Sequence, residues 1–401
     1  METSLKSGRG SRSIQLKYKF THEDCFALLL GLIWADTILI TYVRAVLIRV
    51  PYISDYREDI LTYMFLLVLI LSLPYMVKRI RPGLLVIYLS CTAVYLVNML
   101  LYPRNREALG ENFVPFLIES LPLIFVGAAM DLKKNYRMLH IISLVSVIVK
   151  FIHLLIEPNN VIYGDMDSSY KLLPHVCVLI AAALSKKDLL NISVSVVGIF
   201  TIISFGTRGP ILCMLVLVIC YMIFFEKIHK HIWFFCTVLL LVLCIIFFYD
   251  EFVQLILSLI QKMGMSTRIF DMLLAGDIME SSGRNVIQAR LLEAVSDNWF
   301  GYGIAGDRAI VGAYAHNILV EFLVSYGLIL GTALFVIPLL YTVVLLVRKI
   351  KNHQIEDTYI LALISACYIK LFLSGTYLTE SLLYLLIGVL LTEHRVLKHK
   401  K

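Results

Sequence analysis

Three short groups of residues have the types and spacing to do chemistry at the surface of a membrane. They are Gly206-Thr207-Arg208-Gly209-Pro210, Ser281-Ser282-Gly283-Arg284, and His316-Asn317 with Glu321 about one helical turn later. An imidazole exchanges a proton near neutral pH, and a guanidinium group binds phosphate or carboxylate in a bidentate way. Together the three groups predict a site that combines a proton acceptor with anion binding.

The group around Arg208 joins two apolar segments through a turn so short that the arginine must lie at the membrane boundary. Proline suits the first turn of a helix, and a helix N-terminus beside an arginine is a ready anion site. An arginine that extends to lipid headgroups is the alternative. We favour anion binding because Gly206 and Gly209 leave backbone N–H groups approachable.

Arg284 repeats this pattern, because a glycine stands beside an arginine at the start of a predicted helix over 285–297. The helix has one apolar stripe, formed by Ile287, Leu291, Ala294 and Val295. Arg290 lies six residues after Arg284 and therefore on a different face of the helix. Both arginines are candidate substrate-binding residues, although they need not bind the same ligand.

His316 and Asn317 stand where a glycine-punctuated loop enters a long apolar segment. Polar residues are costly at such a place and therefore indicate function, although a histidine at a helix start is more often a hydrogen-bonded cap. His153 and His175 lie inside apolar segments and are predicted core residues, and the three histidines have no zinc-ligand spacing. We predict His316 as the catalytic base, with Asn317 and Glu321 beside it in the substrate site.

The composition places these groups in a polytopic membrane protein. Of the 401 residues 59% are hydrophobic and only 16% are charged, and the mean hydropathy is +0.83. All eight cysteines fall in apolar segments without a C-x-x-C, so neither disulfides nor a thiolate metal site is expected. The net charge of +7 is explained by basic loops on one side of the membrane and requires no nucleic-acid partner.

The hydropathy predicts an all-α integral membrane protein with about twelve transmembrane helices. They cover 25–47, 59–77, 84–101, 113–130, 138–156, 172–185, 189–205, 210–225, 232–249, 316–347, 357–374 and 379–392. Residues 1–24 form a basic tail, 25–249 the first nine helices, 250–315 a long loop with short helices, and 316–401 the last three helices and a tail. In the loop, the segment after Glu251 is predicted as an amphipathic interfacial helix. Gly327 and Gly331 are expected to bend the overlong tenth helix.

The basic residues set the predicted orientation, because cytoplasmic loops are enriched in lysine and arginine. With both termini in the cytoplasm, every short inside loop carries such residues. The outside face carries mostly arginine, at Arg49, Arg57, Arg104, Arg106, Arg208, Arg268, Arg284, Arg290 and Arg308. Any single arginine could equally well neutralise a neighbouring carboxylate. The preference for arginine over lysine across the whole outside face favours anion binding. Charges within the predicted spans could mark an ion pathway, and they are Asp36, Arg44, Lys150 and Lys370. For Arg44 and Lys150 we favour the alternative that each faces a polar edge or has an internal partner.

The run S-G-R-N…W-F-G-Y-G…H-N-I-L-V-E…Y-G-L-I-L-G-T within 281–331 resembles the O-antigen polymerase and O-antigen ligase superfamily. The G-T-R-G turn at 206–209 is similar to the S-R-G turn of that superfamily, with Thr207 where serine is frequent. The tryptophan often found shortly after the S-G-R arginine is absent. The predicted helix number, the long outside loop and the inside termini match too, so the resemblance covers most of the chain.

The resemblance implies a GT-C-like glycosyltransferase of the plasma (inner) membrane, with its active site facing the periplasm or exterior. The donor would be a glycan on undecaprenyl pyrophosphate. The acceptor would be a second lipid-linked repeat unit for a polymerase of O-antigen, capsule or exopolysaccharide, or a lipid A core for a ligase. His316 would be the base and Arg208 and Arg284 would hold the pyrophosphate, with inversion of the anomeric carbon.

The expected partners are these two glycans, the lipid bilayer, and a flippase and a chain-length regulator of the same pathway. The one D-x-D run in the outside loops, Asp165-Met166-Asp167, sits alone in a short loop, so we expect transfer without metal or cofactor. A lipid flippase or secondary transporter is the alternative of another class, but it predicts two similar halves, and the sequence has no internal repeat. We therefore predict a repeat-unit polymerase, with the ligase as its alternative.

Overall fold

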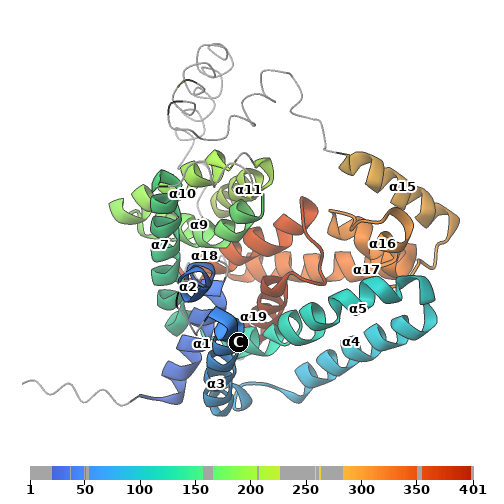
Figure 1. Cartoon of the computed structure of the whole chain (residues 1–401), viewed down its shortest axis with the longest axis horizontal. Coiled ribbons are helices and arrows are strands. Elements are labelled where there is room, and N and C mark those ends of the chain that lie inside the picture. Colours follow the sequence, from blue (N-terminus) through green and yellow to red (C-terminus); the bar gives the residue numbers. More distant parts are fainter. Residues whose placement is uncertain are drawn as a thin grey trace, which may run out of the picture.

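The computed structural model describes residues 20–36, 38–48, 50, 54–156, 166–205, 207–225, 258, 262, 283–349 and 355–398. Within these ranges the regular elements are helices joined by turns and short loops (Figure 1). The α-helices are α1 His22–Asp36, α2 Leu39–Ile48, α3 Arg57–Val77, α4 Pro82–Leu101, α5 Arg106–Val114, α6 Leu123–Ala129, α7 Leu132–Ile156, α9 Met166–Lys186, α10 Leu189–Ser204, α11 Arg208–Phe224, α15 Arg284–Asp297, α16 Gly306–Val311, α17 Ile318–Lys349, α18 Ile355–Leu363 and α19 Ser381–Lys398. Short 3-10 or π turns are η1 Ser54–Tyr56, η2 Pro103–Asn105, η3 Pro115–Ser120, η7 Ile364–Ile369 and η8 Lys370–Phe372.

Six of the described helical segments are long and apolar enough to cross a bilayer. They are Asp59–Val77, Pro82–Leu101, Pro103–Ala129, Leu132–Ile156, Asp167–Lys186 and Ile318–Arg348. The shorter apolar helices Leu189–Ser204, Gly209–Phe224 and Ser381–Thr392 also coincide with predicted spans. The all-helical class is thus confirmed for the described residues, and these helices support a membrane protein, whereas the total of twelve spans stays a prediction. The predicted span 232–249 lies outside the described residues, as does the amphipathic helix after Glu251 except for Ser258 and Lys262.

Two predicted spans take a different course in the structure. The segment 25–47 is divided, because α1 ends at Asp36 and α2 begins at Leu39; an acidic residue at the carboxyl end of a helix opposes the helix dipole. The helical run predicted over 113–130 already begins at Pro103. Proline suits a first helical turn. The residues that follow Pro103 are polar, so hydropathy does not predict them as part of a membrane span.

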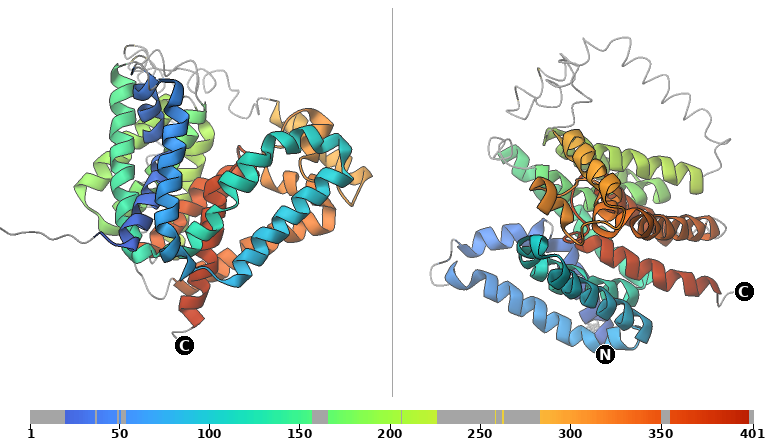
Figure 2. Two further views of the ribbon diagram at one scale, coloured as in Figure 1. Left: turned by 60° about the horizontal axis from the view of Figure 1, so that its bottom comes forward. Right: turned by 90° about the vertical axis from the view of Figure 1, so that its right-hand side faces the viewer.

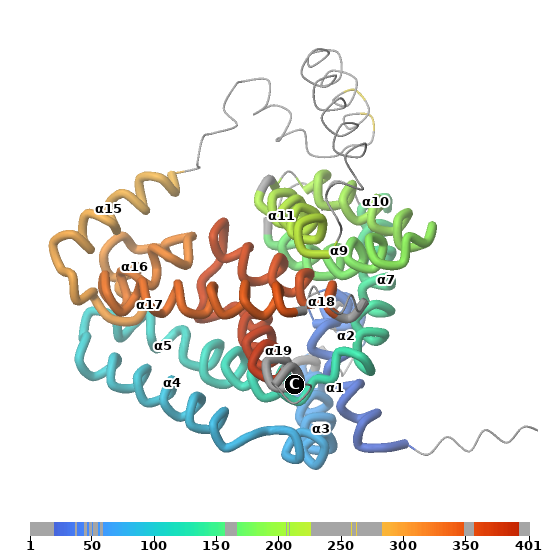
Figure 3. The backbone as a smooth tube through the Cα atoms, turned by 180° about the vertical axis from the view of Figure 1, so that it is seen from behind, coloured from blue at the N-terminus to red at the C-terminus, as the bar shows by residue number. Residues whose placement is uncertain are grey.

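The helices form a bundle around α9, from which one pair of helices extends. Most of α9 is buried, and α7, α10, α11 and α18 pack against it. α4 and α5 run side by side away from the bundle (Figures 1 and 3). α15 and α16 lie at the far end of this extension, beside the first turns of α17 (Figure 2). Arg284 and His316 therefore lie near the end of α17 that begins at Ile318.

The two histidines predicted as core residues are buried or partly buried inside the bundle, and each has a polar partner. His175 is fully buried, with Nδ1 3.3 Å from the Ser143 hydroxyl. His153 Nδ1 lies 2.8 Å from the Tyr42 hydroxyl. The sequence pattern around them contains no polar neighbours, because these partners come from other helices.

Contacts between helix ends fall into two sets, which correspond to the two predicted sides of the membrane. Contacts on the predicted cytoplasmic side are Arg79–Asp131 at 3.9 Å, Lys134–Glu23 at 2.7 Å and Ser185–Thr358 at 2.9 Å. Contacts on the predicted outer side are Asn105–Ile304 at 2.9 Å, Arg284–Leu373 and Thr376–Glu321. None of these six contacts joins opposite sides, so they agree with the predicted alternation of helix directions.

A break in α17 at Gly327 positions the candidate site. Gly327 has φ 79° and ψ 175°, and it is the one non-helical position within α17. In an uninterrupted helix the Leu328 N–H would donate to the Val324 carbonyl. Instead Tyr302 N donates to Val324 O at 2.7 Å, and Leu328 N donates to Trp299 O at 2.9 Å. We call these two hydrogen bonds the α17 bridge; they satisfy backbone groups that an apolar surrounding would leave unpaired.

Only glycine fits at two positions of the α17 bridge. A Cβ atom on Gly327 would lie 2.3 Å from Trp299 O, and one on Gly301 would lie 2.4 Å from Gly327 N. Both residues also have positive φ, a conformation that side chains with a Cβ rarely adopt. The predicted bend at Gly327 is confirmed, whereas Gly331 lies inside the helical part of α17.

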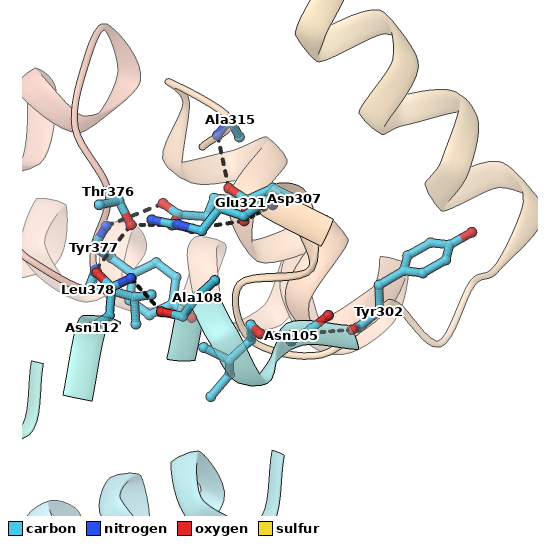
Figure 4. A network of polar contacts seen from close by, with 12 residues as sticks. Asn105, Ala108, Asn112, Tyr302, Asp307, Ala315, Glu321, Thr376, Tyr377 and Leu378 are labelled. Atoms are coloured by element: carbon cyan, nitrogen blue, oxygen red, sulfur yellow. Dashed lines mark hydrogen bonds and ion pairs between the residues drawn. The ribbon is translucent and has the colours of Figure 1, made fainter. Parts of the chain in front are cut away.

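Two asparagines hold the loop from the side of α4. Asn105 Nδ2 donates to the carbonyls of Tyr302 at 2.8 Å and Ile304 at 2.9 Å, and Figure 4 shows the first of these contacts. Asn98 Oδ1 accepts from Ile304 N at 2.9 Å. The loop after α15 is therefore held between α4 and α17.

Replacing Gly327 with alanine should lower the free energy of unfolding by about 2 kcal/mol or more, because strained backbone costs about 1–3 kcal/mol and a close contact adds to it. Thermal unfolding of the detergent-purified protein measures this. Gly110→Ala in α5 is the matched control, since no atom lies within 4 Å of a Cβ there. Equal melting temperatures for the two variants would contradict the role of the α17 bridge.

Candidate functional site

His316 lies in the turn between α16 and α17, two residues before α17 begins. Its φ of 55° is in the left-handed region, which is uncommon for histidine. The imidazole packs against the Tyr314 ring with 4.0 Å between centroids. The Arg308 guanidinium lies 6.0 Å from the centre of that same Tyr314 ring. The orientation of the imidazole is therefore set by Tyr314, and Tyr314 is contacted by Arg308.

The environment of His316 keeps its imidazole neutral. Burial and the positive charge of Arg284 lower the pKa of His316 to about 4. Its Nδ1 atom is buried and has no hydrogen-bond partner among the described residues. At pH 7 this side chain is thus an unprotonated imidazole that can interact with a hydroxyl group of a ligand.

Arg284 is the first residue of α15, and Gly283 before it has φ 80°. The helix start agrees with the prediction to within one residue, and two members of the predicted apolar stripe, Leu291 and Val295, are buried against α17. Arg284 Nη1 donates to the carbonyl of Leu373, just after η8. No carboxylate pairs with Arg284 in the part of the chain that the structure describes. The guanidinium is therefore a half-buried positive charge beside His316.

Arg208 is the first residue of α11, and its side chain lies outside the described residues. The backbone nevertheless brings this helix start close to Arg284. A Cβ atom on Gly209 would lie 1.9 Å from the Tyr170 hydroxyl oxygen, and the Tyr170 hydroxyl is within electrostatic range of Arg284. The start of α11 thus lies beside Tyr170, which is within electrostatic range of Arg284.

Asn317 and Glu321 take part in contacts that shape this region. Asn317 Oδ1 accepts from Leu319 N at 3.0 Å and from Val320 N at 3.4 Å, so it caps the first turn of α17. Glu321 is 1% exposed and accepts from the Thr376 hydroxyl and from Tyr377 N (Figure 4). Both side chains stabilise the site, and their direct contact with substrate stays a prediction.

A buried ionic network closes the turn that carries His316. Asp307 Oδ1 accepts from Arg308 Nη1 at 2.8 Å, and Asp307 Oδ2 accepts from Ala315 N at 2.9 Å (Figure 4). Arg308 Nη1 also lies 3.6 Å from Glu321 Oε1. For Arg308 the interpretation as a partner of neighbouring carboxylates is therefore right. The network ties the turn from Asp307 to Ala315 to the first turn of α17.

Arg290 lies apart from Arg284, as the predicted helix face requires, and its contact with substrate stays a prediction. Arg290 is exposed on α15, and among the described residues no contact brings it to Arg284 or His316. Lys370 was noted only as a charge within a span, but its Nζ lies 5.8 Å from the centre of the Tyr170 ring, at the edge of this region. The only feature of the sequence that could indicate a role for Lys370 is its position as an isolated lysine near the outer end of an apolar helix.

The arrangement is suited to an anion. It presents the Arg284 guanidinium, a helix start and a neutral imidazole, which are the groups that bind phosphate and accept a hydrogen bond. Among the described residues no cluster of three or more His, Cys, Asp or Glu side chains is arranged to hold a metal ion.

We predict that His316 stays neutral down to a pH of about 4. Because its pKa in the fold is below the ordinary value of about 6.5, the neutral form favours the folded state. This contribution to stability is complete above pH 6.5 and is lost as the pH falls toward 4. Isotope-labelled histidine NMR measures the titration, with His316→Asn identifying the resonance. A midpoint near 6.5 would contradict the burial and the nearby arginine charge.

Comparison with known proteins gives one finding, which coincides with these residues. Residues 193–336 match the family model described as O-Antigen ligase, and this range contains Arg208, Arg284 and His316. No curated protein and no solved structure matches the chain, so the GT-C-like fold stays a prediction. The family implies a membrane-embedded enzyme related to glycosyl transfer. The match confirms that this chain resembles the O-antigen ligase and polymerase superfamily.

Proposed function

We propose that the protein transfers a glycan from undecaprenyl pyrophosphate to a sugar hydroxyl at the outer face of the plasma membrane. The observation that supports this most strongly is the pairing of a neutral imidazole, His316, with Arg284, a cation without a carboxylate partner among the described residues. The match to the O-Antigen ligase family over the same residues agrees with it.

The proposed chemistry needs only a base and cations. A sugar–diphosphate bond is already activated, so the acceptor hydroxyl must lose a proton and the leaving diphosphate must be stabilised. His316 takes the proton while the acceptor oxygen bonds to the anomeric carbon. The bond from that carbon to the diphosphate breaks, and Arg284 and Arg208 hold the leaving anion. This single displacement inverts the anomeric carbon and uses neither metal nor cofactor.

Because Arg284 lies near His316, binding of the donor changes the pKa of the base. The charge of Arg284 contributes to the low pKa of His316. When a diphosphate binds at Arg284, its negative charge offsets the guanidinium, and the pKa of the imidazole rises. The base is therefore strengthened only when the donor is in place, which limits transfer to the loaded enzyme.

The leading proposal for the acceptor is a second lipid-linked repeat unit, which makes the protein a polymerase of O-antigen, capsule or exopolysaccharide. A flippase and a chain-length regulator would then act with it. The description of the matched family favours a second candidate, an O-antigen ligase whose acceptor is a lipid A core. The two candidates share the donor and the base and differ in the acceptor.

His316→Ala should slow transfer at least about a hundredfold, because general base catalysis contributes about 10²–10⁴ in rate. Arg284→Lys should lose most activity, since lysine cannot bind phosphate in a bidentate way. Purified protein is incubated with a lipid-linked repeat unit, with or without a lipid A core, and the product is sized. A ladder of polymer identifies the polymerase, and a glycosylated core identifies the ligase.

Arg104→Ala is the matched control for this assay, because Arg104 is an exposed arginine on the same predicted side. Its rate should equal that of the wild type, and a chelator should leave the rate unchanged. Full activity of His316→Ala, or absence of transfer to either acceptor by the wild type, would contradict the proposal.

The proposed site faces the exterior and both termini face the cytoplasm. A membrane-impermeant maleimide should label Glu293→Cys on α15 in intact cells and Lys133→Cys on α7 only after permeabilisation. Both positions are exposed in the structure, and wild-type cells measure the background from native cysteines. The reverse pattern of labelling would overturn the proposed orientation.

A further inference from the structure

Lys370 lies beside the proposed diphosphate site and has no role in the mechanism described so far. It is the first residue of η8, which continues the α18 helix after the π turn η7. Its side chain is 18% exposed and forms an ion pair with Glu380, which is 10% exposed. An ionised lysine with so little exposure in a membrane protein is costly and marks a candidate functional residue.

Two contacts connect Lys370 to Arg284. The Lys370 ammonium lies 5.8 Å from the centre of the Tyr170 ring, and the Tyr170 hydroxyl is within electrostatic range of both cations. Arg284 in turn donates to the carbonyl of Leu373, one residue after η8 ends. Lys370 thus begins η8 and Arg284 contacts the residue that follows it, and Tyr170 lies within electrostatic range of both cations.

The carboxylates near these cations do not neutralise all of the positive charge. Glu380 pairs with Lys370, and Asp167, which is exposed, pairs with Lys171 at 2.5 Å. Arg284 has no such carboxylate among the described residues. A diphosphate ester carries more negative charge than one arginine neutralises, and a lysine ammonium has three donors, of which Glu380 uses one.

We propose that Lys370 is a further donor-binding residue, whose ammonium binds the leaving diphosphate and selects a diphosphate carrier over a monophosphate. Glu380 is a positioning residue that holds the ammonium in place when the donor is absent. The flexible four-carbon stem of lysine allows it to contact phosphate while it stays near Glu380. This inference rests on the proposed function, since it assigns a contact of the same donor.

The alternative interpretation is that the Lys370–Glu380 pair only fastens η8 to the segment before α19. The two interpretations differ in what an exchange of charges does. A structural ion pair tolerates the exchange, because attraction between the two positions is kept. A phosphate contact does not, because a carboxylate then stands where the ammonium stood.

The test measures binding of a polyprenyl diphosphate and of the matching polyprenyl monophosphate to the purified full-length protein by calorimetry. The variants are K370M/E380Q, which removes both charges together, and K370E/E380K, which exchanges them. We expect both variants to bind the diphosphate about tenfold to a hundredfold more weakly, the range of one charge-assisted hydrogen bond. Monophosphate affinity should change less than threefold, and thermal unfolding shows that each variant is folded.

Wild-type diphosphate affinity in the exchanged variant would overturn the assignment of Lys370 and leave the proposed function intact. An equal loss for monophosphate and diphosphate would overturn the selection between carriers. If the exchanged variant does not fold, K370M/E380Q decides, and unchanged affinity there overturns the proposal. Failure of the wild-type protein to bind any polyprenyl diphosphate would count against the proposed function itself.

Discussion

An interrupted helix in apolar surroundings must find partners for the backbone groups that the break releases, and the structure around α17 follows from this requirement. At Gly327 the hydrogen bond between Val324 and Leu328 is replaced by two hydrogen bonds to residues 299–302. Residues 299–302 therefore supply the hydrogen bonds that α17 lacks at its break. Because the loop is also held by Asn98 and Asn105, it joins α4, α15 and α17 at one end of the protein.

The site lies where this arrangement brings charges together. Buried Asp307 closes the turn before α17, and Asn317 caps the helix, so His316 is held with a strained backbone against Tyr314. Arg284 starts the neighbouring helix, and burial together with its positive charge lowers the pKa of the His316 imidazole and keeps it neutral. Carboxylates pair with Arg308 and with one donor of Lys370, whereas Arg284 has none among the described residues. The charge distribution therefore favours an anionic ligand at Arg284.

The sequence could predict features that depend on neighbouring residues in the chain, but not contacts between residues far apart in it. The bend at Gly327, the start of α15 and its apolar stripe are local properties, and the structure confirms them. The contact between this bend and residues 299–302 was not predictable, because the hydrogen bonds join backbone atoms and do not depend on which side chains are present. Glu321 is predicted in the substrate site because it lies about one turn after His316, and its observed partner Thr376 is 55 residues away in the sequence. The neighbours of Lys370 were not predictable for the same reason, since Tyr170 and Arg284 are distant from it in the sequence.

The measurement that tests the central claim most directly is a cryo-electron microscopy map of the protein with a non-hydrolysable polyprenyl diphosphonate. The claim is that the broken helix holds Arg284 and His316 as one anion-binding site. It predicts both phosphonate groups beside the Arg284 guanidinium, His316 at the adjoining sugar position, and Tyr302 N still bonded to Val324 O. Phosphonate density at the opposite ends of the helices, near Arg79 and Lys134, or a continuous α17 without the bridge, would contradict it.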